Sequence, residues 1–182
     1  TIAVYGDYDV DGITSTCLLT EFLRERGGHV ICYIPDRTGE GYGLNRGAVD
    51  RLGQQGVKLI VTVDCGISCK EEVRAIKADG IDVVITDHHE PGSMVPEGVP
   101  VADPKCDPKC ESSILAGVGV ALKVVQVLGG RLGKPHLWRD YTDFATLGTV
   151  ADLMPLRGEN RALVADGIEK MNKHPRPCIA AL

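Results

Sequence analysis

The sequence predicts an α/β fold, a Rossmann-like parallel sheet of about five strands flanked by helices, with a helical C-terminal part. Short apolar runs alternate with segments whose apolar residues recur every three or four positions, as expected when strands alternate with helices in a parallel sheet. From Ile114 onward no further strand pattern is needed, and the apolar spacing is helical. In the first half, several apolar runs end directly on acidic or histidine residues, which is typical of a ligand site at one sheet edge.

Strands are expected at the apolar runs 1–6, 29–34, 57–63, 81–86 and 99–102. Helices are expected between them over 13–26, 45–56 and 68–78. Asn45 is a good N-cap for the second of these helices, and Ser68 with Glu71 has the spacing of a capping box for the third.

The second half is expected to be helical over 114–128, 140–150 and 160–171, and to cap one end of the sheet. We expect one domain over 1–182, with a parallel α/β part at 1–103 and the helical part at 114–182. Two segments are expected to be irregular: the Gly-rich loop PDRTGEGYGL, which is a plausible substrate-facing segment, and the doublet DPKCDPKC, which its prolines interrupt.

Composition restricts the class of protein. The chain has 182 residues, 43% of them hydrophobic, and its 20 Lys+Arg against 25 Asp+Glu give a formal net charge of −5. This balance argues against a simple basic nucleic-acid-binding module. It does not exclude a phosphate substrate, because divalent cations bound among clustered acids would invert the local field.

The chain has no apolar run of the ~20 residues that a membrane span requires, and it begins inside a strand pattern rather than a signal peptide. An odd number of cysteines, 7, fits reduced thiols better than a disulfide framework. A cytoplasmic protein without membrane contact is therefore expected. The pairs Cys65/Cys69 and Cys106/Cys110 lack the two-residue gap of a zinc knuckle, which makes structural zinc the weaker interpretation.

Acidic and histidine residues follow three of the predicted strands: Asp7, Asp9 and Asp11 after the first, Asp64 after the third, and Asp87, His88 and His89 after the fourth. Each cluster alone also fits a solvated turn or a helix cap. Together they predict a site for two Mg²⁺ or Mn²⁺ ions, because the carboxyl ends of parallel strands converge and hard oxygen ligands with one imidazole suit these ions. Two such ions would support hydrolysis of a phosphodiester or phosphoanhydride.

These motifs resemble the DHH phosphoesterases, named for the triplet found here at 87–89. The resemblance extends over essentially the whole chain through YGDYDVDG, VTVDCG, TDHHEPG, LAGVGVALK, LGTVADLMPL and ENRALVADG, in that order. Within the family, this order and spacing resemble the catalytic core of the bacterial exonucleases that degrade single-stranded DNA from 5′ to 3′.

The resemblance assigns roles by motif position. It implies that the metal ligands are Asp7, Asp9, Asp11, Asp64, His88 and Asp152, with Asp7 binding directly or through water. It places His89 at the scissile phosphate, with Asp87 orienting His88 from behind. The strand-end pattern adds the expectation that Asp64 bridges the two ions. Asp152 follows a predicted helix, so the strand-end pattern alone does not reveal it.

The resemblance also implies a substrate and partners. Single-stranded DNA would be the substrate in repair and recombination, with a helicase and a single-strand-binding protein as partners of the full-length enzyme. A DHH-associated domain and an oligonucleotide-binding fold, both expected in such enzymes, are absent from this chain. Candidate phosphate contacts are Arg37, Arg157 and Arg161, although a surface role is the commoner one for scattered arginines. Tyr42 and Tyr8 are weaker candidates for stacking on bases.

The expected activity is therefore metal-dependent 5′-to-3′ hydrolysis of single-stranded DNA that releases 5′-mononucleotides. One alternative is a DHH phosphodiesterase acting on short oligonucleotides or cyclic dinucleotides. Another is a non-catalytic nucleic-acid-binding scaffold, which the intact motif acids disfavour. A pyrophosphatase is disfavoured because Tyr5 stands where pyrophosphatase-like relatives carry a metal-binding histidine.

Overall fold

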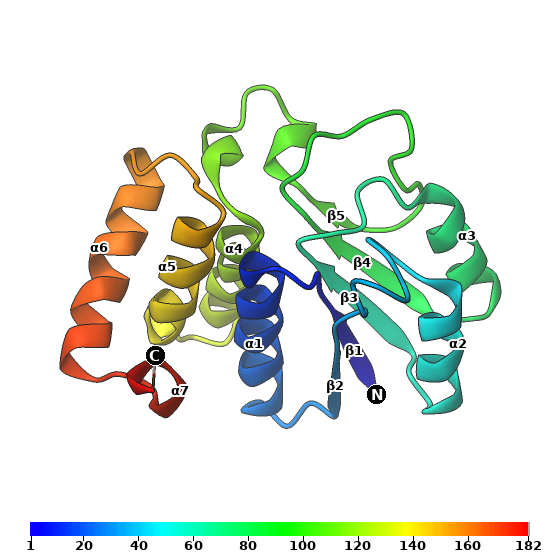
Figure 1. The fold of residues 1–182 in the computed structure, drawn as a ribbon, viewed down its shortest axis with the longest axis horizontal. Coiled ribbons are helices and arrows are strands. Elements are labelled where there is room, and N and C mark those ends of the chain that lie inside the picture. Colours follow the sequence, from blue (N-terminus) through cyan, green and yellow to red (C-terminus); the bar gives the residue numbers. More distant parts are fainter. Residues whose placement is uncertain (182) are drawn as a thin grey trace.

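The sheet at the centre of the molecule is fully parallel. The computed structural model describes residues 1–181, and its five strands have the order β2-β1-β3-β4-β5 (Figure 1). The strands are β1 (Ile2–Tyr5), β2 (Val30–Tyr33), β3 (Leu59–Val63), β4 (Asp82–Thr86) and β5 (Val101–Ala102). The predicted fold class, a parallel sheet flanked by helices with a helical C-terminal part, is confirmed.

Helices cover both faces of this sheet, with α2 and α3 on one face and α1 and α4 on the other (Figure 1). The α-helices are α1 (Val10–Arg24), α2 (Arg46–Gln54), α3 (Lys70–Ala78), α4 (Gly117–Arg131), α5 (Thr142–Ala151), α6 (Gly158–Lys173) and α7 (Pro177–Ala180). Short 3₁₀ turns are η1 (Pro104–Cys106), η2 (Glu111–Ile114) and η3 (Leu137–Tyr141). Within residues 1–181, no helix combines the length and apolar character needed to cross a membrane.

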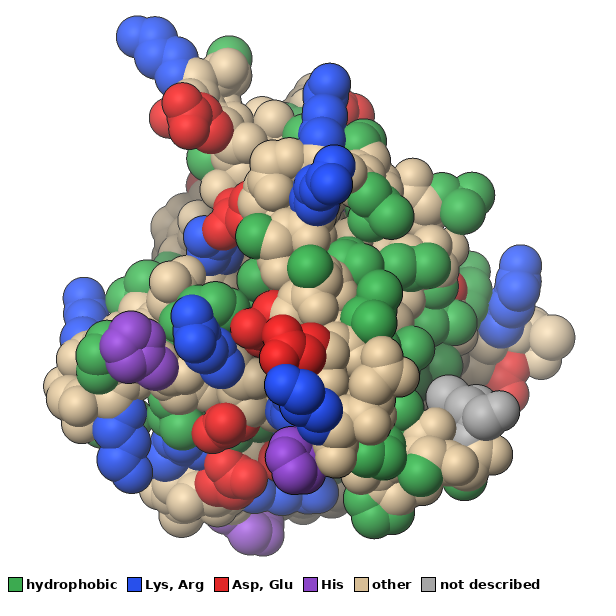
Figure 2. Space-filling view, turned by 90° about the vertical axis from the view of Figure 1, so that its left-hand side faces the viewer, with side chains coloured by type: hydrophobic (Ala, Val, Ile, Leu, Met, Phe, Trp, Pro, Cys, Tyr) green, Lys and Arg blue, Asp and Glu red, His purple; other side chains and the backbone are tan. Residues whose placement is uncertain are grey.

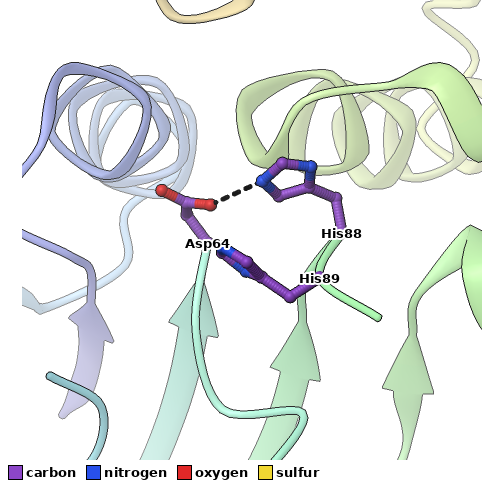
Figure 3. A group of neighbouring side chains, drawn as sticks. All are labelled: Asp64, His88 and His89. Carbon is purple, nitrogen blue, oxygen red and sulfur yellow. Dashed lines mark ion pairs between the residues drawn. The ribbon is translucent and has the colours of Figure 1, made fainter. Parts of the chain in front are cut away.

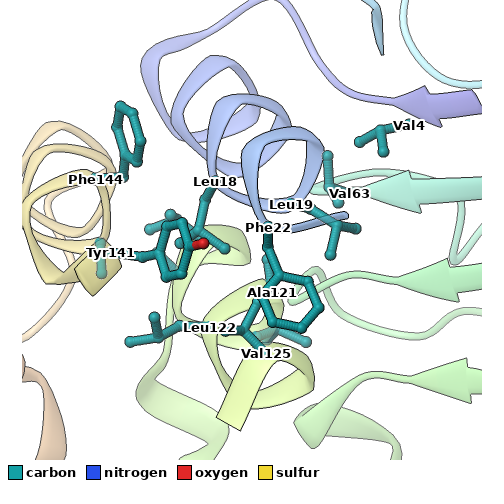
Figure 4. Close-up of a cluster of buried hydrophobic side chains, with 14 of the residues drawn as sticks. Val4, Leu18, Leu19, Phe22, Val63, Ala121, Leu122, Val125, Tyr141 and Phe144 are labelled. Carbon is teal, nitrogen blue, oxygen red and sulfur yellow. The ribbon is translucent and has the colours of Figure 1, made fainter. Parts of the chain in front are cut away.

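Alternation along the strands builds two hydrophobic cores. In β1, Val4 faces the core that contains α1 and α4, whereas Ala3 and Tyr5 face the core that contains α2 and α3. The α1 and α4 core joins the sheet to the helical part, because Phe22 of α1 packs edge-to-face on Tyr141 with ring centroids 6.2 Å apart (Figure 4). Both faces of the sheet are thus buried.

The expectation that the helical part caps one end of the sheet is wrong. α4 lies on the face of the sheet, in contact with β3 and β4, and α5 and α6 form a further layer outside α1 and α4 (Figure 1). The reason is the composition of α4, whose first turns from Gly117 to Leu122 are buried throughout. A helix that is apolar on nearly all sides needs neighbours on nearly all sides.

Two helix starts differ from the sequence-based expectation. α1 begins at Val10, because the Asp9 carboxylate accepts a hydrogen bond from Gly12 N (2.8 Å) and so caps the helix three residues earlier. α3 begins at Lys70 without a side-chain cap, so the predicted capping box of Ser68 and Glu71 is wrong.

The backbone before α3 is held instead by a residue that follows the next strand, β4. Asp87, directly after β4, accepts a hydrogen bond from Ile67 N at 2.9 Å. The predicted cap of α2 is confirmed, since Asn45 Oδ1 accepts a hydrogen bond from Ala48 N at 3.1 Å.

We predict opposite effects for two glycine-to-alanine changes in the helical part. A Cβ on Gly167 of α6 would lie 2.0 Å from Thr146 Oγ1 and 2.4 Å from Thr142 O on α5, so Gly167→Ala should lower the free energy of unfolding. The loss should be about 1–3 kcal/mol, as for overpacking. A Cβ on the exposed Gly130 of α4 meets nothing within 4 Å, so Gly130→Ala should stabilise the protein by about 0.5–1 kcal/mol. Urea denaturation of both variants tests this, and equal effects would contradict the close α5–α6 contact.

Candidate metal centre

The centre of the site lies where β3 and β4 end. Asp64 follows β3, and His88 and His89 follow β4, so that their side chains meet above the carboxyl edge of the sheet (Figure 3). His88 Nε2 lies 3.1 Å from Asp64 Oδ1, and both side chains are buried. Asp64 has a left-handed backbone, with φ of 60°. Few residues other than glycine adopt this conformation, and aspartate is among those that tolerate it best.

Asp11 is held by the first turn of α4. Its Oδ2 accepts a hydrogen bond from Gly117 N (2.7 Å) and its Oδ1 accepts one from Val118 N (2.8 Å), so a buried carboxylate meets the positive end of the helix. Gly117 must be glycine, because a Cβ there would lie 2.7 Å from the Cβ of Asp64. The close approach of α4 therefore fixes Asp11 and Asp64 together.

The three acids that follow β1, Asp7, Asp9 and Asp11, do not all point the same way. Asp9 caps α1 and Asp11 lies in its first turn, so the helix turns Asp11 toward α4. Asp7 and Asp9 instead group with Asp64.

The ligands proposed from the sequence nevertheless converge. Three groups of side chains have potential ligand atoms within 4.8 Å of one another: Asp7 with Asp9 and Asp64, Asp11 with His88 and Asp152, and Asp64 with His88 and His89. Asp64 and His88 each occur in two groups, so the groups are contiguous. This arrangement can hold two neighbouring cations with Asp64 between them.

Asp152 reaches this centre from the helical part. It is the C-cap of α5, and its Oδ2 lies 3.6 Å from His88 Nε2. The next residue, Leu153, has φ of 55°, so the chain turns away sharply after the carboxylate. Strand-end patterns cannot reveal a ligand at the end of a helix, and only the resemblance pointed to it.

The acids of the centre repel one another. Burial raises the pKa of Asp64 far above its usual value, and the charges of Asp11 and Asp9 add to the effect. Burial also raises the pKa of Asp11, to about 6, and that of Asp7. In the described part of the chain, Asp7 Oδ1 and Asp64 Oδ1 are buried without a hydrogen-bond donor. Divalent cations would supply the missing charge and bonds, so these residues fit Mg²⁺ or Mn²⁺.

Asp87 separates the roles of the two histidines, and the expectation that it orients His88 is wrong. Its Oδ1 lies 2.7 Å from His89 Nδ1 and accepts a hydrogen bond from His88 N (2.7 Å), so it holds the ring of His89 and only the backbone of His88. Asp87 thereby raises the pKa of His89. Burial and the neighbouring charge of His89 lower the pKa of His88. A neutral His88 suits metal ligation, and a charged His89 suits an anion.

The predicted substrate contacts are only partly brought together. Tyr42 lies over the centre, with its hydroxyl 3.3 Å from His89 Nδ1. The guanidinium of Arg37 lies 5.3 Å from the ring centroid of Tyr8, and its charge opposes the raised pKa of Asp7. Arg157 and Arg161 are exposed at the start of α6, the first of them as its N-cap.

The fold and the site define the class of protein as an open parallel α/β domain with an acid-rich, histidine-containing centre at the carboxyl edge of its sheet. The family model described as "DHH family, N-terminal domain" matches residues 1–149. The chain belongs to the DHH family.

Similar proteins include single-stranded-DNA-specific exonucleases named RecJ. The chain is 44% identical over 176 residues to RecJ of Bacillus subtilis, an alignment that covers 96% of this chain and 22% of the relative. It is 40% identical over 172 residues to RecJ of Thermus thermophilus, covering 93% of this chain and 25% of the relative. The chain thus spans about a quarter of these relatives or less.

A solved structure of exonuclease RecJ bound to manganese matches with a TM-score of 0.86 and 40% identity, covering 93% of this chain and 43% of that one. A structure of RecJ from Thermus thermophilus in complex with Mn²⁺ matches with a TM-score of 0.79 and 37% identity, covering 93% of this chain and 24% of that one.

We predict that Asp64→Asn stabilises the metal-free protein at pH 7 by about 1–3 kcal/mol, because it removes a buried carboxyl whose ionisation the fold opposes. The direction in which stability changes with pH follows from the effect of folding on the pKa values. The pKa values of Asp64 and Asp11 are raised by folding, so their contribution to stability is complete below about pH 4 and is lost as the pH rises through their folded values, which is about 6 for Asp11. Asparagine also tolerates the left-handed backbone.

Thermal unfolding between pH 4 and 8, in chelator and in Mn²⁺, measures this effect. The variant should lose less stability than the parent as the pH rises in chelator, and it should gain less from Mn²⁺. Asp82→Asn at an exposed position of β4 is the matched control and should change stability by less than about 0.5 kcal/mol. A metal-free Asp64→Asn protein less stable than the parent would contradict the repulsion described above.

Proposed function

We propose that this chain is the catalytic centre of a metal-dependent phosphodiesterase that degrades single-stranded DNA from 5′ to 3′ and releases 5′-mononucleotides. The observation that carries the proposal is the contiguity of two ligand groups, Asp7/Asp9/Asp64 and Asp11/His88/Asp152, joined by the 3.1 Å contact between Asp64 and His88. The similarity to RecJ exonucleases along nearly the whole chain supports this substrate and polarity.

The metal ligands in this proposal are the six side chains assigned by motif: Asp7, Asp9, Asp11, Asp64, His88 and Asp152. Mn²⁺ or Mg²⁺ is the proposed pair of ions, since structures named for RecJ contain one or the other. When bound, the ions supply activation of the attacking water and neutralisation of charge on the phosphate.

The remaining chemistry belongs to the chain. Asp64 and Asp11 have fixed positions before substrate arrives, because the start of α4 packs against the first and donates to the second. Asp87 holds the ring of His89 with Nδ1 toward the carboxylate, which leaves Nε2 available to donate a proton or a hydrogen bond to the phosphate. The proposal therefore gives catalytic roles to His89 and Asp64.

Substrate binding in this proposal uses Arg37 and Tyr42 beside the centre, with Arg157 and Arg161 further along the strand. Basic and acidic side chains are intermixed on the outer face of the helical part, without a continuous basic track across that face (Figure 2). The DNA path is therefore expected at the carboxyl edge of the sheet.

We further propose that residues 1–103 and 114–182 form one DHH domain. Its proposed setting is cytoplasmic repair and recombination, beside a helicase and a single-strand-binding protein.

The first test is Mn²⁺-dependent hydrolysis of a 5′-phosphorylated single strand labelled at either end. The parent should release labelled mononucleotides from the 5′ end, and Asp64→Ala should lose both this activity and part of its Mn²⁺ binding. Internal fragments, or loss from the 3′ end, would contradict the proposed polarity. Cleavage confined to dinucleotides or cyclic dinucleotides would replace the substrate with the short-oligonucleotide alternative.

A second prediction concerns Asp87. Asp87→Asn removes the charge that raises the pKa of His89, so kcat should fall about 10–100-fold, and the decline in kcat at high pH should begin at a lower pH. A pH–rate profile with saturating Mn²⁺ measures both effects, with Asp82→Asn as the control. An unshifted profile would mean that His89 does not act as the acid.

A further inference from the structure

The doublet DPKCDPKC follows β5 and contains two copies of the same short turn. In the first copy, Asp103 Oδ1 accepts a hydrogen bond from Lys105 N at 2.8 Å. In the second, Asp107 Oδ1 accepts one from Lys109 N at 3.0 Å. The local conformation is therefore repeated, and any difference in function must come from where each copy lies.

The two copies have different surroundings. Asp103 is buried, with 8% of its surface exposed, whereas Asp107 and Lys109 are exposed. Asp103 lies beside the DHH triplet because β5 pairs with β4 in parallel, and Asp87 N donates to Ala102 O at 3.1 Å. The first copy thus starts next to the metal centre, and the second lies beyond it.

The ammonium of Lys105 lies at the edge of this centre. Its Nζ is 3.2 Å from Oε1 of Glu90, the residue that follows His89. Its charge also reaches both histidines: it adds to the effect of burial in lowering the pKa of His88, and it opposes Asp87 in setting the pKa of His89. Among residues 1–181, Lys109 makes no comparable ion pair with Glu90.

The ion pair with Glu90 does not explain the position of Lys105. The side chain of Glu90 is 83% exposed, against 23% for that of Lys105. Pairs this exposed contribute about 0–1 kcal/mol and exchange readily with other partners. A phosphate group offers the same ammonium a stronger, charge-assisted hydrogen bond.

We propose that Lys105 binds a phosphate of the nucleic-acid strand beside His89, and that Glu90 occupies Lys105 until the strand arrives. The buried Asp103 acts as a positioning residue, because its hydrogen bond to Lys105 N shapes the turn that carries the ammonium. This inference rests on the proposed function of the centre, which it extends by one phosphate contact. It gives the first copy of the doublet a role that the second lacks.

The experiment compares KM and kcat of the full chain for a single-stranded oligonucleotide in Mn²⁺ over a series of salt concentrations. Lys105→Ala should raise KM about tenfold with little change in kcat, as expected for one lost charge-assisted contact. The slope of log KM against log salt should become shallower by about 0.7, the value for one phosphate of a single strand. Lys109→Ala, in the same local turn, is the matched control and should change neither quantity.

Glu90→Gln separates binding from a merely structural ion pair. If Glu90 competes with phosphate, this variant should lower KM and keep the salt dependence. If Lys105 serves only to pair with Glu90, Glu90→Gln should reproduce the effects of Lys105→Ala, which would overturn the proposal. Lys105→Gln and circular dichroism check that lost affinity does not reflect lost folding, and Mn²⁺ stoichiometry should match that of the parent.

Two failures can be told apart. If the parent hydrolyses the strand but the Lys105→Ala and Lys109→Ala variants have equal KM and equal salt dependence, only the proposed role of Lys105 is rejected. A parent that releases no nucleotide in Mn²⁺ rejects the proposed function, and the phosphate contact with it.

Discussion

The two hydrogen bonds from the start of α4 to the carboxylate of Asp11 are the interaction on which the rest of the site depends. They join the α/β part to the helical part at a point where both are buried. The same approach requires glycine at position 117, because the backbone of α4 lies against Asp64. A single helix start thus fixes an acid of α1 and the acid that follows β3, and the α4–α5 packing behind it brings Asp152 to the same place.

This packing has an electrostatic cost that the fold does not remove by itself. The helix start partly compensates Asp11, whose two hydrogen bonds lower its pKa against the larger effect of burial. Asp64 has no such compensation from donors in the described residues, and its pKa is raised much further. Asp64 is therefore the acid of the centre that most needs a cation, and it lies between the two ligand groups.

The sequence allowed the strand-end ligands to be predicted, because short apolar runs identify the strands and the carboxyl ends of parallel strands must meet. It could not assign partners within the triplet. Which histidine Asp87 holds depends on side-chain directions after β4, and these are set by the bond from Ile67 N to Asp87. Strand-end reasoning could not predict Asp152, because this residue follows a helix. The sequence could not distinguish the two copies of the doublet after β5, because they are identical in sequence and differ in burial.

Tyr5 shows how the sheet also positions the Gly-rich loop over the metal centre. Its side chain points away from the metal centre into the α2 and α3 core, so it cannot replace a metal-binding histidine. Its hydroxyl instead donates to Gly43 O at 3.0 Å and accepts from Asn45 N at 3.2 Å. These bonds hold both neighbours of Leu44 and therefore the end of the Gly-rich loop, which places Tyr42 over His89. Tyr5 thus orders the loop that carries Tyr42, so β1 leads into the acids of the metal centre and also shapes the loop above it.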